Sequence, residues 1–129
     1  MLELWQNAEL DHRPKGRDTL ENLQAERRRI PDLYWGVFDK QRIVGSIIGT
    51  EDGRRGWLNR LVVHPDYRKK NIAQALIAVC EKALKARGIR IIAGLVMEDN
   101  NASIKTLESC DYELYQGVLY FSKRESWDV

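Results

Sequence analysis

The sequence has few cysteines, few prolines and no long apolar run. Of its 129 residues only Cys80 and Cys110 are cysteine and three are proline. Two cysteines, both in segments with a helical pattern, are too few for the disulfide framework of a small secreted domain. No stretch approaches the roughly 18 consecutive apolar residues of a transmembrane helix, and the N-terminus lacks the pattern of a signal peptide. We therefore expect a soluble, cytoplasmic protein.

An excess of charge of one sign is also lacking. The 21 Lys and Arg residues against 19 Asp and Glu residues leave a net charge of +2. So small a charge does not draw a chain toward nucleic acid or anionic lipid. The length and the 43% hydrophobic content fit one globular domain over residues 1–129. We expect no nucleic-acid partner, no membrane partner and no metal site.

The first half of the chain changes from a helical to a strand-like pattern. Charged helical segments span residues 1–8 and 18–29, and Pro31 ends the second. Three apolar runs joined by short polar turns then predict an antiparallel meander over Leu33–Phe38, Ile43–Thr50 and Gly56–Val63. Gly45 and Gly49, inside the second strand, indicate a bulge or a close backbone approach.

The second half alternates helices and strands. Apolar residues recur every three or four positions from Ile72 to Ala83, which predicts one long helix that Gly88 ends. The remaining patterns predict a buried strand, a short helix and two closing strands, over Ile89–Met97, Asn100–Ser109, Tyr112–Tyr115 and Val118–Ser122. The predicted fold class is α+β, with a mixed central sheet built from the meander plus a β-α-β-α-β-β unit.

The most informative segment is Leu61–Ala73, where a predicted strand passes through a short turn into a helix. The free N–H groups of a first helical turn, together with the helix dipole, bind anions. Arg68, Lys69 and Lys70 add positive charge at the same place, and the small Ala73 lets a ligand approach the backbone. A basic cluster alone is more typical of a solvated helix start, but the strand-turn-helix context reverses that preference and favours an anion-binding loop.

These residues resemble the cofactor loop of the GNAT superfamily of acyl-CoA-dependent N-acyltransferases. The family pattern Arg/Gln-x-x-Gly-x-Gly/Ala, preceded by Val-x-Pro-x-Tyr/Phe-Arg, is matched at Val63, Pro65, Tyr67, Arg68 and Ala73. Asn71 stands where the central glycine is usual, and asparagine is one of the few residues that tolerate a left-handed backbone. A second family motif is matched at Asn100 and Tyr112 but not at Leu107 and Asp111.

The resemblance covers about residues 32–123 and implies a GNAT fold that binds acetyl-CoA between two splayed parallel strands. In this chain those strands end at Val63 and near Met97. Backbone groups of Leu61 and Val63 would pair with the pantetheine arm, the loop N–H groups would hold the pyrophosphate, and Asn100 would reach the pantetheine or adenosine end. The implied cofactor-binding residues are Leu61, Val62, Val63, Arg68, Lys69, Lys70, Asn71, Ile72, Ala73 and Asn100.

The implied activity is transfer of the acetyl group of acetyl-CoA to an amine, on a small molecule or a protein, by direct attack. Asn59 stands where several relatives have a catalytic Glu, and Leu107 where relatives have a Tyr that protonates the departing sulfur. Asn59 also fits an ordinary strand residue. Because both proton-handling positions differ, we expect slow turnover, and a CoA-binding module with weak or no catalysis is the alternative.

Two histidines are candidate bases. His12 and Arg13 lie in the connection between two helices, where family acceptor sites form, so we consider them for substrate contact beside the plain interpretation of a solvated loop. His64 precedes Pro65 outside the predicted strand, and its position favours a structural role.

The family fold begins with a strand that pairs beside Leu33–Phe38, and this chain starts inside the helix that follows that strand. The apolar edge left open predicts either self-association as a homodimer or a truncated gene start. We expect Trp35 and Trp57 to pack in the core.

Overall fold

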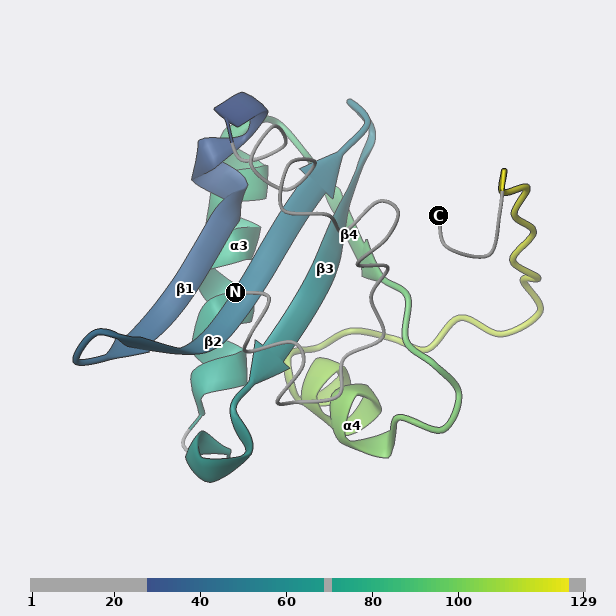
Figure 1. The fold of residues 1–129 in the computed structure, drawn as a ribbon. Coiled ribbons are helices and arrows are strands. Elements are labelled where there is room, and N and C mark those ends of the chain that lie inside the picture. The colour runs from purple at the N-terminus through teal and green to yellow at the C-terminus, as the bar shows by residue number, and fades with distance from the viewer. Residues whose placement is uncertain (1–27, 69–70, 126–129) are drawn as a thin grey trace.

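The computed structural model describes residues 28–68 and 71–125 and shows one open sheet with a long helix against one face (Figure 1). The sheet has four strands in the order β1-β2-β3-β4. The elements in chain order are η1 (Pro31–Leu33), β1 (Tyr34–Asp39), β2 (Arg42–Glu51), β3 (Arg55–Val63), η2 (Pro65–Tyr67), α3 (Ile72–Ala86), β4 (Ile91–Gly94) and α4 (Asn101–Ser109).

The strands pair as the meander predicts. β1 is antiparallel to β2, and β2 is antiparallel to β3. β4 returns parallel to β3 after the crossover through α3, and their register runs from Arg55 opposite Ile91 to Leu58 opposite Gly94. The α+β class with a mixed sheet is therefore confirmed.

Three glycines allow α3 to lie close against the sheet. A Cβ on Gly49 would lie 2.8 Å from Cys80 Sγ, and a Cβ on Gly56 would lie 2.9 Å from Leu84 Cδ1. A Cβ on Gly45 would lie 3.2 Å from both the Ile72 and the Leu76 side chains. The helix residues are spaced by four, so they form one ridge along α3. The close approach that Gly45 and Gly49 indicated is confirmed.

This contact is the centre of the hydrophobic core. The buried cluster joins η1, the sheet, α3 and the segment after it through Ile30, Leu33, Ile47, Leu58, Leu76, Ile77, Cys80, Leu84 and Ile89. Burial raises the pKa of the Cys80 thiol to about 12, so Cys80 is a packing residue rather than a reactive thiolate.

An ion pair fastens the other end of α3. Arg87, which follows the last turn, donates from Nε and Nη2 to the Asp32 carboxylate of η1, with an Nε–Oδ2 distance of 2.8 Å. The bond to Arg87 holds the pKa of Asp32 below its usual value. Since both side chains are partly exposed, the pair sets the position of η1 more than it stabilises the fold.

The predicted strand Ile89–Met97 is too long, since β4 contains only Ile91–Gly94. Ile89 is buried and its N–H donates to Leu84 O at 3.2 Å, so it closes the end of α3 instead of starting the strand. Leu95 and Met97 are exposed beyond the point where pairing with β3 stops.

The two predicted closing strands are wrong for this structure. Residues 112–116 and 118–124 form neither helix nor strand, although Gly117 has the positive φ of the expected turn, +85°. Their apolar side chains are exposed at Leu114, Tyr115, Val118, Leu119, Tyr120 and Phe121. A strand needs a neighbour that continues alongside it, and β4 is too short to supply one.

β1 lies at one end of the sheet order, and among the described residues it pairs with β2 alone. The expectation of a uniformly open apolar edge is only partly correct, because Leu33 is fully buried in η1. Trp35 does not pack in the core: it is 38% exposed, and its indole Nε1 donates to Asp32 O at 2.8 Å. Trp57 is half-buried.

We predict that Gly49→Ala destabilises the protein by about 1–3 kcal/mol, because the added methyl overlaps Cys80 Sγ in a packed core. Combining it with Cys80→Ala removes the overlapping sulfur, so the double variant should lose less than the sum of the single losses. Urea denaturation measures all four free energies of unfolding. Gly94→Ala is the matched control, since its Cβ would meet Leu107 at an ordinary 3.7 Å. Additive losses would contradict the close approach.

Candidate functional site

The site begins with a bulge in β3. Ser46 lies opposite Val62 and Ile48 opposite Asn59, so two steps on β2 correspond to three on β3. The extra residue is Arg60, whose φ of +53° is left-handed, and its carbonyl accepts a hydrogen bond from Ser46 Oγ at 3.3 Å. A bulge bends its strand. Pairing with β4 stops at Leu58, two residues before it.

The bend leaves one edge of β3 open between Asn59 and Val63 among the residues that the structure describes. His64 N donates to Val44 O at 2.7 Å, so the backbone groups of His64 face β2. Successive residues of a strand face opposite edges, and Val63 and Leu61 therefore direct their N–H and C=O groups to the open edge. Consistently, Val63 O accepts from the Arg68 side chain, Nε to O 3.3 Å, rather than from β2.

A tight turn links this edge to α3. His64 starts η2, where its Nδ1 accepts from Asp66 N at 3.1 Å, and Arg68 follows in an extended conformation. Asn71 then adopts the left-handed conformation, with φ 59° and ψ 21°, immediately before the first residue of α3. The prediction that Asn71 replaces the usual glycine by tolerating this backbone is confirmed.

The N-terminus of α3 has backbone donors to spare. Within the part of the chain that the structure describes, Asn71 makes no side-chain capping hydrogen bond and the first turn holds no acidic residue. Its first N–H groups are therefore left without a side-chain cap among the described residues, and with the positive end of the helix dipole they are what an anion site requires. Ile72 and Ala73 begin this turn, and Ile72 packs over Gly45.

The other predicted residues have diverse environments. Asn100 caps α4, its Oδ1 accepting from Ser103 N at 3.2 Å. Val62 is buried and contributes packing. Leu107 is half-buried on α4 and faces Gly94 at the end of β4. His12, Arg13, Lys69 and Lys70 lie outside the described residues.

Asn59 is half-buried and acts as a donor. Its Nδ2 lies 2.9 Å from Thr50 Oγ1 and 3.4 Å from Trp57 O. Since Gly56 and Leu58 contact the α3 side, strand alternation places Asn59 on the opposite face. An amide in this setting cannot act as a base that takes a proton from a substrate amine.

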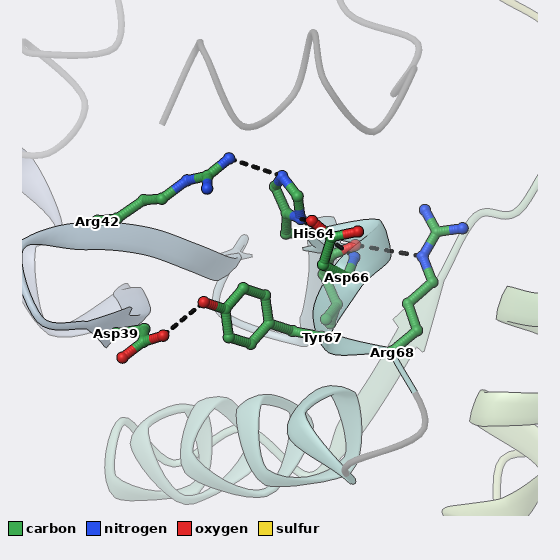
Figure 2. Close-up of polar contacts among 7 residues, drawn as sticks. Asp39, Arg42, His64, Asp66, Tyr67 and Arg68 are labelled. Carbon is green, nitrogen blue, oxygen red and sulfur yellow. Dashed lines mark hydrogen bonds and ion pairs between the residues drawn. The ribbon is translucent and has the colours of Figure 1, made fainter.

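A polar cluster around η2 was missed by sequence reasoning. Figure 2 shows Tyr67 directed at Asp39 and Arg42 directed at His64. Tyr67 OH donates to Asp39 Oδ2, and Arg42 Nη2 lies 2.8 Å from His64 Nε2. Asp39 and Arg42 end β1 and begin β2, so only the tertiary fold brings them to the turn.

His64 has a structural role in this cluster, as its position predicted. The residue is 8% exposed, and both ring nitrogens face donors, the Arg42 guanidinium and the Asp66 N–H. These two contacts and its burial fix the ring between the hairpin end and η2.

Among the described residues, no three His, Cys, Asp or Glu side chains gather where they could hold a metal ion. No described helix combines the length and the apolar character that crossing a membrane requires.

Comparison with known proteins decides the family. The sequence model of the acetyltransferase (GNAT) family matches residues 1–112. The chain belongs to the GNAT acetyltransferase family. An acetyltransferase of Sodalis glossinidius is 40% identical to it over 124 residues, which cover 96% of this chain and 86% of the relative.

Solved GNAT structures share the fold. The aminoglycoside N-acetyltransferase AAC(6')-Iy, in complex with the bisubstrate analogue CoA-S-monomethyl-acetylneamine, has a TM-score of 0.70 at 18% identity and covers 95% of this chain and 91% of its own. The PaiA N-acetyltransferase of Thermoplasma acidophilum, in complex with coenzyme A, has a TM-score of 0.68 at 22% identity, with coverages of 82% and 73%. Acetyl-CoA is the cofactor of this family, and the open edge of β3 beside the uncapped α3 fits it.

We predict that Asn71→Gly keeps or improves CoA affinity, because glycine adopts the left-handed backbone at no steric cost. Asn71→Val should instead weaken binding, since a β-branched residue strains at this φ. Calorimetric titration with CoA measures both. If the glycine variant lost binding while staying folded, the Asn71 side chain rather than its backbone would hold the ligand.

Proposed function

We propose that this protein is an N-acetyltransferase that transfers the acetyl group of acetyl-CoA to an amine by direct attack, at the carboxyl end of β3. The observation that carries the proposal is the open backbone edge of Leu61 and Val63 next to the uncapped first turn of α3. One end offers strand-like hydrogen bonds to amides, and the other offers donors and positive charge to phosphates.

Acetyl-CoA supplies the acetyl group as a thioester. The N–H and C=O groups of Leu61 and Val63 bind the amide-containing arm as an added strand would. A backbone N–H near Val63 is fixed by the β2–β3 pairing. It can therefore stabilise the negative charge that develops on the thioester carbonyl oxygen during the attack, without any reorganisation of the protein. The first-turn N–H groups of α3 and the Arg68 guanidinium hold the pyrophosphate, for which Arg68 gives up its bond to Val63 O. We also assign to this region Lys69, Lys70 and, at the start of α4, Asn100.

Proton handling is the weak step of this site. Asn59 donates to Thr50 and cannot act as a base, so the acceptor amine must arrive neutral or lose its proton to water. Leu107 offers no proton to a departing thiolate. A CoA-binding module with weak or no turnover is therefore the alternative, favoured by the chemistry of these two side chains.

The acceptor is an amine on a small molecule or a protein. In our proposal, the acceptor subsite includes the His12–Arg13 connection. We also propose that the protein is located in the cytoplasm. Self-association through β1 as a homodimer stays a prediction, supported by the absence of a second partner strand for β1 among the described residues.

The test is calorimetric titration with acetyl-CoA, followed by thiol release against a panel of amines. We expect binding to the unaltered protein, and at least tenfold weaker binding to Arg68→Glu, because the substitution places a negative charge at the pyrophosphate. Arg90→Glu makes the same charge change at an exposed position beside the far end of β4 and should bind normally. If millimolar acetyl-CoA produced neither a heat of binding nor a thermal shift, the proposal would be refuted. Binding of acetyl-CoA without turnover would select the alternative, a CoA-binding module.

We predict that Leu107→Tyr raises kcat with little change in the affinity for acetyl-CoA. A positioned general acid typically contributes about 10²–10⁴-fold, and the gain here should be at the low end because a thiolate leaves readily. Leu107→Phe is the matched control, since it adds the ring without the hydroxyl. Equal rates for the tyrosine and phenylalanine variants would show that no acid is needed.

A further inference from the structure

The cluster in Figure 2 joins two segments that the chain separates widely. Asp39 and Arg42 are opposite each other in the register of β1 and β2, at the hairpin end. Each of them contacts one residue of the turn after β3. Asp39 accepts a hydrogen bond from Tyr67 OH, 28 positions along the chain, and Arg42 contacts His64, 22 positions along. His64 and Tyr67 are the residues that bracket the first turn of η2, since Tyr67 N donates to His64 O at 2.8 Å.

The turn held in this way leads directly to the phosphate end of the site. Tyr67 is followed by Arg68, whose Nε donates to Val63 O at 3.3 Å, and Asn71 opens α3 three residues later. A backbone bond from His64 N to Val44 O also attaches the start of the turn to β2. Within the turn, the His64 and Tyr67 rings meet edge-on, with centroids 5.9 Å apart. The hairpin end thus holds the outer side of the turn, through Asp39 at Tyr67 and Arg42 at His64.

We propose that the β1–β2 hairpin end acts as a clamp, in which Asp39 and Arg42 are positioning residues that hold η2 and so set the affinity for the pyrophosphate end of CoA. The inference rests on the proposed function, because it needs CoA as the ligand. It goes beyond that function in giving a role to residues outside the cofactor loop. Tyr67 supplies the hydroxyl, and its bond to Asp39 raises the pKa of Tyr67, so the phenol stays a donor through neutral pH.

The charge of Asp39 makes the test decisive. A carboxylate beside a phosphate site repels the ligand, so electrostatics alone predicts that Asp39→Asn tightens CoA binding. The clamp predicts the opposite, because asparagine is a weaker, neutral acceptor for Tyr67 OH. Tyr67→Phe removes the same bond with no change of charge. Arg42 is a poor choice for this test, since losing a cation weakens anion binding under either explanation.

The experiment measures the Kd of CoA by calorimetry, and thiol release from acetyl-CoA and from S-acetylpantetheine, for the unaltered protein, Asp39→Asn and Tyr67→Phe. Both variants should raise the Kd of CoA and the KM of acetyl-CoA about three- to tenfold, with kcat unchanged. S-acetylpantetheine lacks the pyrophosphate, so its kinetic constants should not move. Tyr115→Phe, at an exposed tyrosine, and Asp66→Asn, which removes a neighbouring 80% exposed carboxylate, are the matched controls. Neither control should weaken CoA binding.

Three results would overturn the clamp. In the first, CoA binds both variants as tightly as the unaltered protein. In the second, Asp39→Asn alone binds CoA more tightly, as electrostatics predicts. In the third, both substrates would be affected equally with a lowered melting temperature, which would reduce Asp39 and Tyr67 to fold stability. Failure of the unaltered protein to bind CoA would instead refute the proposed function, and the clamp would fall with it. If the unaltered protein binds CoA but shows no turnover, the Kd of CoA for the unaltered protein and the two variants decides whether the clamp holds.

Discussion

The contact between α3 and the sheet is the constraint on which the remaining architecture depends. Glycine at positions 45, 49 and 56 removes the side chains that would hold the helix away, and a ridge of α3 residues spaced by four fills the space. A helix fixed along its whole length has a fixed first turn. The N–H groups of that turn therefore lie at a defined place beyond the end of β3, and an anion can be bound without the helix having to move.

The bulge at Arg60 supplies the second half of the site by a different means. An extra residue in β3 turns the strand just after its pairing with β4 stops, so that Leu61 and Val63 keep their bonding capacity while losing a neighbour on that side within the described chain. Unpaired backbone at the middle of a sheet is costly unless something satisfies it. In this structure Arg68 satisfies Val63 O, and the bound arm of the cofactor would take its place in our proposal.

Sequence reasoning was most successful where the signal is local. The meander, the long helix and the left-handed residue before it are confirmed, because strand alternation, helical period and asparagine's tolerance act over a few residues. The prediction of the closing strands was wrong because the pattern at 112–122 reports only that the segment is able to form a strand. It carries no information on whether a neighbouring strand continues beside it. The contact of Tyr67 with Asp39 had no local signal at all, since it depends on how the hairpin end meets η2. The His12–Arg13 hypothesis lies outside the described residues.

The site separates two tasks that are often assigned to the same side chains. In our proposal, binding rests on backbone groups and a helix N-terminus, so asparagine in place of the usual glycine at position 71 leaves the left-handed geometry intact. Proton transfer has no such substitute, because a backbone amide neither accepts a proton from an amine nor gives one to a thiolate near neutral pH. With Asn59 and Leu107 at the two proton-handling positions, our proposal is that the chain keeps its affinity for the cofactor while its rate depends on water and on the protonation state of the acceptor amine. In this proposal an acceptor amine that is already neutral at working pH can begin the attack without a base.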